Sequence, residues 1–143
     1  MNNKYISHLI LGVRIYAVTM KDALACAEEM IRSDKPHVVA TANAEMVMLA
    51  REDEELFNIL NRCSLVVPDG AGILWAGDVL GYPFPERVTG ADYTEELLRL
   101  ATRESWPVYF LGGAPGVAEK AIRRFSERNG KFPLAGVHDG YFC

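Results

Sequence analysis

Asp69 stands where an apolar run gives way to glycines, in the stretch VVPDGAG of residues 66–72. The run that ends at residue 67 is typical of a buried strand, and ILWAGDVL, residues 73–80, is typical of a helix. A carboxylate at such a junction has two interpretations. It caps the helix from Gly70, since aspartate is a favoured N-cap residue, or it takes a proton from a substrate hydroxyl as a general base, in the space that its small neighbours leave.

A second candidate for ligand binding is the glycine-rich stretch GGAPG, residues 112–116, which follows the apolar run VYFL. Gly112 and Gly113 let the backbone approach a ligand closely, and Pro115 suits the first position of a helix. The free N–H groups at that helix N-terminus would attract a phosphate. The stretch is neither a Walker A loop nor the G-x-G-x-x-G pattern, which disfavours an NAD-dependent enzyme. A tight turn that binds nothing is the alternative.

Three further polar residues follow or interrupt apolar runs. Thr41 and Asn43 come after HVVA, and they are either caps of the next helix or ligands of a sugar or phosphate. Arg87 lies in the loop YPFPERVTGA, which is rich in proline and glycine. It is either a solvated loop arginine or a cation that meets a leaving phosphate when the loop closes.

Metal-binding patterns are missing from the sequence. The histidines, His8, His37 and His138, are scattered and have no metal-ligand spacing. There is also no Asp-x-Asp pair that would hold a divalent ion against a nucleotide diphosphate. We therefore expect neither a metal site nor a cofactor.

The apolar pattern predicts the elements that position these residues. A β-ribbon turns near Gly12, and Thr19 begins a helix with Asp22 three residues later. Strands are expected at 37–42, 64–68 and 107–113, and a fourth strand with its exit loop at 133–142. Helices are expected at 70–81, 92–104 and 115–128, while residues 44–52 and 53–62 form two short helices or one bent helix. Apolar strands separated by helices indicate an α/β fold, with a Rossmann-like, mostly parallel sheet covered on both faces. Met46 and Trp75 are expected in its core.

Ligands of open parallel sheets bind at the carboxyl ends of the strands. The candidates other than Arg87 follow strands, so we expect these residues to converge on one edge of the sheet. The length of 143 residues predicts a single domain.

The composition excludes several classes of protein. A net charge of −4 argues against a nucleic-acid partner, because such proteins cluster lysine and arginine. No window approaches the roughly 18 apolar residues of a membrane span, and no signal peptide is recognisable. The cysteines, Cys26, Cys63 and Cys143, are odd in number and widely spaced, which fits a reducing cytoplasm.

Five segments occur in an order that resembles the WecG/TagA/CpsF glycosyltransferases, over about residues 11–142, and within that family the TagA type. They are TANAEMVMLARED, VVPDGAGILWA, RVTGAD, VYFLGGAPGVAEKA and LAGVHDGYF. The resemblance implies an inverting, metal-independent transfer of N-acetylmannosamine from UDP-ManNAc to the 4-hydroxyl of GlcNAc on undecaprenyl diphosphate, in wall teichoic acid linkage-unit synthesis.

The resemblance also implies a role for each candidate residue. Asp69 would be the base, and Arg87 would lie near the diphosphate. Thr41 and Asn43 would line the sugar pocket. The residues implied to hold UDP are Gly112, Gly113, Gly116 and Tyr141.

The sequence departs from the family after residue 142, where members continue with a strand, a segment with a glutamine near the sugar, and a basic appendage. We therefore expect a truncated catalytic domain, with a second copy of the chain among its candidate partners as a homo-oligomer. Its full-length form is expected to be cytoplasmic and peripheral on the inner face of the plasma membrane. Two alternatives stay open. One is a related transferase that uses UDP-ManNAcA or UDP-glucose, and the other is a non-catalytic nucleotide-binding α/β module.

Overall fold

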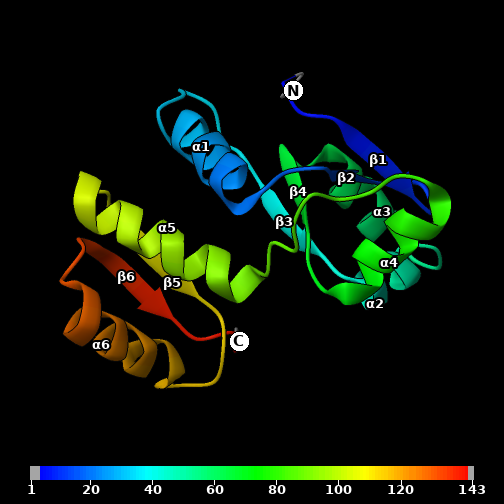
Figure 1. Cartoon of the computed structure of the whole chain (residues 1–143). Coiled ribbons are helices and arrows are strands. Elements are labelled where there is room, and N and C mark those ends of the chain that lie inside the picture. Colours follow the sequence, from blue (N-terminus) through cyan, green and yellow to red (C-terminus); the bar gives the residue numbers. More distant parts are fainter. Residues whose placement is uncertain (1–3, 142–143) are drawn as a thin grey trace. The chain divides into compact units, whose positions relative to one another are not determined.

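The computed structural model describes residues 4–141, and these alternate between helices and short strands (Figure 1). The α/β class and the parallel pairing of strands predicted above are confirmed. The chain divides into two compact units, residues 1–93 and 94–143. The single catalytic domain stays a prediction. Phe142 of the G-Y-F motif and Cys143 lie outside the described residues.

The first unit begins with the predicted ribbon. Strands β1 (Ser7–Ile10) and β2 (Val13–Tyr16) pair antiparallel around a tight turn at Leu11 and Gly12. Helix α1 (Met20–Ile31) follows, and it begins with the expected capping box. The Thr19 hydroxyl accepts from the N–H of Asp22, and the Asp22 carboxylate accepts from the N–H of Thr19 at 3.0 Å.

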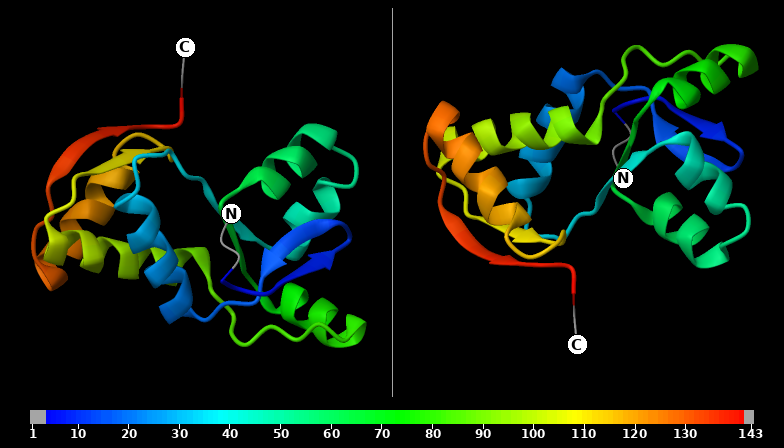
Figure 2. Two further views of the ribbon diagram at one scale, coloured as in Figure 1. Left: turned by 90° about the horizontal axis from the view of Figure 1, so that it is seen from above. Right: turned by 90° about the horizontal axis from the view of Figure 1, so that it is seen from below.

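Strands β3 (Val39–Ala42) and β4 (Leu65–Pro68) pair in parallel, with Ala42 opposite Pro68. Two separate helices, α2 (Ala44–Leu49) and α3 (Glu54–Arg62), connect them. Helix α4 (Ala71–Leu80) follows β4. The ribbon lies beside α3 and α4 (Figure 2).

The core of the first unit lies between the ribbon, the parallel pair and the helices α2, α3 and α4. Met46 packs partly buried against it, as expected. Trp75 does not, since its side chain is 69% exposed. Helix α4 is apolar almost all round but buries the face of Ile73 and Gly77, and Trp75 is about 200° around the helix from Ile73. High hydrophobicity predicted the helix but not its inward face.

The segment between α4 and α5 (Gly90–Glu104) is the predicted loop, and it is tied down at several points. Phe84 is buried and its ring meets that of His8 edge-on. The carboxylate of Glu86 accepts from the N–H of Met20 at 2.9 Å. The N–H of Val88 donates to the carbonyl of Pro68 at 2.9 Å.

The second unit holds strands β5 (Val108–Leu111) and β6 (Leu134–His138), which pair in parallel with a bulge near Val108. They form a hydrogen-bonded pair of their own, separate from β3–β4. Helix α6 (Val117–Asn129) connects them and packs against β6. Its N-cap is Gly116, so Pro115 precedes the cap and the prediction that it opens the helix is wrong.

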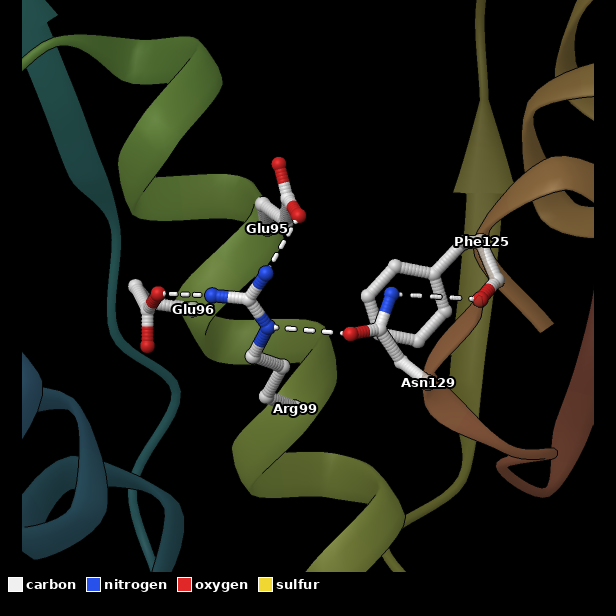
Figure 3. Close-up of polar contacts among 5 residues, drawn as sticks. All are labelled: Glu95, Glu96, Arg99, Phe125 and Asn129. Carbon is white, nitrogen blue, oxygen red and sulfur yellow. Dashed lines mark hydrogen bonds and ion pairs between the residues drawn. The ribbon is translucent and has the colours of Figure 1, made fainter. Parts of the chain in front are cut away.

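The apolar interior of this unit is built on aromatic rings. Phe110, Phe125 and Phe132 have centroids 5.8 Å apart in two contacting pairs. Arg99 links α5 to the end of α6, since its Nε donates to Oδ1 of Asn129 at 3.2 Å (Figure 3). Its other guanidinium nitrogens pair with Glu95 and Glu96 one turn back along α5.

Candidate active site

The ends of β3 and β4 bring three of the predicted site residues together in the first unit. The strands end side by side, and the N–H of Asp69 donates to the carbonyl of Ala42 at 2.9 Å. Thr41 and Asn43 flank Ala42 in the sequence. The carboxyl end of this parallel pair therefore carries a hydroxyl, an amide and a carboxylate, as the sequence predicted.

Asp69 does not cap the helix that follows it. The N-cap of α4 is Gly70, which has a φ of 90° and makes no side-chain cap bond. Glycine adopts that conformation readily, and other residues do so at a cost. Oδ2 of Asp69 instead accepts from the N–H of Gly90, the first residue of α5, at 3.0 Å. The carboxylate therefore joins the end of β4 to a helix that starts 21 residues later.

The N-terminus of α5 is built to hold its position. The Thr89 hydroxyl accepts from the N–H of Asp92 at 3.2 Å and donates to the Asp92 carboxylate at 2.6 Å. This capping pair satisfies the N–H of Asp92, while the N–H of Gly90 serves Asp69. The bond from Val88 to Pro68 fixes the chain just before the helix.

Thr41 lies against the same glycine. A Cβ placed on Gly90 would be 3.2 Å from both Cγ2 and Oγ1 of Thr41, and 3.5 Å from Oδ2 of Asp69. The side chains of Thr41 and Asp69 thus face one point beside the start of α5. Both are only partly buried, so a substrate group has access to them.

Asn43 is a helix cap, which was one of its two predicted interpretations. Its Oδ1 accepts from the N–H of Met46 at 2.8 Å at the start of α2. A Cβ on Gly72 would be 2.9 Å from Cβ of Ala44, so the first turns of α2 and α4 pack closely through small residues. Nδ2 of Asn43 makes no hydrogen bond within residues 4–141 and is available to a ligand.

Arg87 is exposed and makes no hydrogen bond or ion pair within residues 4–141. Its neighbours Glu86 and Val88 are both fixed by the bonds described above. Closure of the whole loop would break those bonds. Arg87 would therefore reach a phosphate by a change of its side-chain rotamer and not by movement of the loop.

The second unit brings together the glycine-rich loop after β5 and the loop after β6. The N–H of Gly112 donates to the carbonyl of His138, and the N–H of Gly140 donates to the carbonyl of Gly113, both at 2.9 Å. A Cβ on Gly140 would be 3.4 Å from the nitrogen of Gly113. The two loops therefore touch backbone to backbone, and little room is left for a side chain at residue 140.

This loop leads into α6 through left-handed glycines. Gly112, Gly113 and Gly116 have φ of 119°, 80° and 81°. Gly116, the N-cap, gives α6 no side-chain cap bond. The first-turn N–H groups of a helix that lacks a capping side chain suit a phosphate.

Tyr141 is 70% exposed, and its N–H donates to Oδ1 of Asp139 at 2.9 Å. The Nδ1 atom of His138 lies 2.7 Å from the carbonyl oxygen of Asp139. The described end of the chain thus holds a ring and a carboxylate beside the glycine loop.

The candidate residues fall into two groups, one in each unit, and the convergence of all four strand ends on one edge stays a prediction. The sequence reasoning missed Gly90. A signal was available, because Thr89 and Asp92 have the spacing of a capping box and place the helix start at Gly90 instead of Asp92.

Residues 4–141 contain neither a metal-binding cluster of side chains nor a helix that could span a membrane. No group of three or more histidine, cysteine, aspartate or glutamate side chains there is arranged to hold a metal ion. None of the helices in this part of the chain has the length and apolarity needed to span a bilayer.

Comparison with known proteins gives a consistent picture. The family model described as "Glycosyl transferase WecG/TagA/CpsF family" matches residues 8–143. Three relatives share the name N-acetylglucosaminyldiphosphoundecaprenol N-acetyl-beta-D-mannosaminyltransferase. That of Bacillus subtilis (strain 168) is 26% identical over 73% of this chain and 41% of its own length. That of Bacillus spizizenii is 29% identical over 76% and 42%. That of Staphylococcus aureus (strain NCTC 8325 / PS 47) is 30% identical over 92% and 52%. The chain thus spans about half the length of the curated relatives it matches.

Proposed function

Because the chain belongs to the WecG/TagA/CpsF family of glycosyl transferases, we propose that it forms the catalytic part of a TagA-type enzyme. This enzyme transfers N-acetylmannosamine from UDP-ManNAc to GlcNAc on undecaprenyl diphosphate, in the synthesis of the wall teichoic acid linkage unit. The names of the relatives support this substrate pair. One observation carries the mechanism: the carboxylate of Asp69 is fixed beside Thr41 and is not used to cap its own helix.

In the proposed reaction, Asp69 is the general base. The acceptor hydroxyl oxygen forms a bond to the anomeric carbon of the donor sugar, and its proton passes to the Asp69 carboxylate. The bond between the anomeric carbon and the diphosphate oxygen breaks, and UDP leaves with the electron pair. A single displacement of this kind inverts the anomeric centre. The Thr41 hydroxyl and Nδ2 of Asn43 are the proposed contacts to the sugar.

The departing UDP carries negative charge that must be stabilised. We assign this stabilisation to groups of the protein and not to a metal ion. The N-terminus of α6, entered through Gly112, Gly113 and Gly116, offers backbone N–H groups to the diphosphate. Tyr141 contributes a ring to the nucleotide. Arg87, whose side chain has no partner among the described residues, supplies a cation.

The acceptor is a lipid in this proposal, so the enzyme works at a membrane surface. We propose peripheral attachment of the full-length protein to the inner leaflet. Sedimentation with vesicles that contain anionic lipid would test this, since electrostatic attachment is lost as salt is raised.

The function is tested with a panel of UDP-sugars and a lipid-linked GlcNAc acceptor, using the full-length protein. The expected result is transfer from UDP-ManNAc in preference to the other donors. Transfer from UDP-ManNAcA or UDP-glucose would reassign the donor within the family. Tight binding of UDP without transfer from any donor would identify a non-catalytic nucleotide-binding module and overturn the proposal.

A further inference from the structure

Asp69 occupies an unusual position for an aspartate before a helix. It precedes the N-cap of α4, yet its carboxylate bonds to the first residue of a different helix, α5. The residue that provides this contact, Gly90, has no side chain and acts through its backbone N–H. The sequence motifs gave it no role.

We propose that Gly90 is a positioning residue for Asp69, which deepens the proposed function and rests on it. Its N–H, at the N-terminus of α5, holds Oδ2 of the carboxylate at 3.0 Å. Its missing side chain keeps Thr41 and Asp69 next to each other at the start of the helix. Gly90 touches no reacting atom in this scheme, and it acts through the orientation of the base.

The two carboxylate oxygens of Asp69 differ in their hydrogen bonding, which supports this assignment. Oδ2 is occupied by the Gly90 N–H, whereas Oδ1 makes no hydrogen bond within residues 4–141. A carboxylate held by one oxygen cannot rotate freely, so the other oxygen presents its lone pairs in a fixed direction. Fixed geometry of a base is worth a large factor in rate, because a small displacement from the productive position is costly.

The anchor is itself rigid on both sides. Before Gly90, Val88 is bonded to Pro68 and the Thr89 hydroxyl holds Asp92. After Gly90, Tyr93 is buried, and its hydroxyl donates a hydrogen bond to the carbonyl of Ala23 at 2.9 Å. The N–H that holds Asp69 is therefore fixed in place by packing and by hydrogen bonds.

The primary test is Gly90→Ala in the full-length protein. The new Cβ would be 3.2 Å from Thr41, a tight contact, and 3.5 Å from Oδ2 of Asp69, an ordinary one. Thr41 or the backbone of Gly90 must therefore shift, and a shift of that backbone moves the N–H that holds the base. We expect kcat for transfer to fall about 10- to 100-fold, while the affinity for UDP itself stays close to wild type. The control is Gly81→Ala, at a left-handed glycine outside the site, with nothing within 4 Å of the new Cβ. It should leave kcat unchanged.

A second pair of variants avoids a steric change in case Gly90→Ala folds poorly. Thr89→Ala removes the cap of α5 and loosens the Gly90 N–H, and Thr19→Ala removes the same kind of cap from α1. We expect Thr89→Ala to lower kcat several-fold and Thr19→Ala to leave it unchanged, although both lower the melting temperature. Equal kcat values for both variants would overturn the proposal.

The final arm separates this inference from the proposed function. In an Asp69→Asn background, Gly90→Ala should produce little further loss of rate, since residues that act as a unit are not additive. The same fold loss in both backgrounds would show that Gly90 does not act through Asp69. Wild-type transfer by Asp69→Asn alone would instead remove the proposed base and leave the packing of Gly90 as a structural feature.

Discussion

The two parallel strand pairs of this chain differ in how much of their surface they bury. All four residues of β4 in the first unit are buried. In β5 of the second unit, half-buried and exposed positions alternate, and Tyr109 and Leu111 are 56% and 65% exposed. Yet LVVP and VYFL look alike as sequences, since both are short apolar runs bounded by turn residues. Periodicity alone does not tell a strand buried on two faces from one buried on a single face.

This difference has consequences for where stability and chemistry lie. The first unit holds a continuous core of ribbon, parallel pair and helices, and Asp69 and Thr41 stand at its edge. The second unit packs Phe132 against the rings of Phe110 and Phe125. We therefore expect changes in the first unit to cost more stability than matched changes in the second.

The largest contrast is expected from two leucines. Leu65 in β4 is fully buried, whereas Leu111 in β5 is largely exposed. Leu65→Ala should lower the free energy of unfolding by about 2–5 kcal/mol through lost burial and a cavity. Leu111→Ala should change it by less than about 0.5 kcal/mol. Urea unfolding of both variants measures this, and equal losses would remove the contrast.

Two glycines give the next largest contrast. A Cβ on Gly72 would meet Cβ of Ala44 at 2.9 Å, and a Cβ on Gly136 would meet the ring of Tyr109 at 2.5 Å. Ala44 is attached directly to the backbone of α2, so Gly72→Ala should cost about 1–3 kcal/mol. The exposed Tyr109 ring can rotate away, so Gly136→Ala should cost less despite the shorter contact.

As a control, each close contact is removed by a second substitution at the partner residue. Adding Ala44→Gly should recover part of the loss in Gly72→Ala, as seen in thermal unfolding. Adding Tyr109→Ala should change Gly136→Ala very little. A larger loss for Gly136→Ala than for Gly72→Ala would contradict the assignment of a rigid first unit.

Alkaline pH should weaken the first unit through Tyr93. Burial raises the pKa of Tyr93 from 10.0 to about 12. The unfolded chain therefore loses this proton at lower pH than the folded chain, so stability falls between about pH 10 and pH 12, by at most about 1.4 kcal/mol per pH unit for one proton. Burial also raises the pKa of the Cys26 thiol, which begins the same trend at lower pH. Tyr93→Phe should flatten the loss between pH 10 and 12, and an unchanged slope would contradict the assignment.

The smallest effect is expected at exposed ion pairs. Arg99 bridges α5 and α6, while Arg32 pairs with Glu28 on its own helix at 2.8 Å. Arg99→Gln should lower stability by less than about 1 kcal/mol, and Arg32→Gln by less still. Both losses should shrink in high salt, as thermal unfolding at two salt concentrations would show.

Local features of the fold were predictable from the sequence. The capping box at Thr19 and the cap at Asn43 depend on residues three positions apart, and both are found in the structure. The turn at Gly12 and the order of strands and helices follow from apolar runs and turn residues. These features are set by short stretches of chain, which is why sequence patterns carry them.

The features that escaped prediction depend on contacts between distant residues. Asp69 bonds to Gly90, 21 positions away, and nothing in the VVPDGAG stretch indicates that partner. Trp75 is exposed because α4 turns a different face inward. The site residue was therefore predictable, but the atom that orients it was not.

The central claim is that Asp69 acts as the general base of the transfer reaction and does not serve only to hold the fold together. The most direct measurement is the transfer rate of Asp69→Asn together with its affinity for UDP on the same preparation, with Asp78→Asn on the exposed side of α4 as the control. The account predicts a rate at least about 100-fold lower, as for a lost general base, with UDP affinity and the control unchanged. A near wild-type rate in Asp69→Asn, or a loss of rate matched by an equal loss of UDP binding, would contradict it.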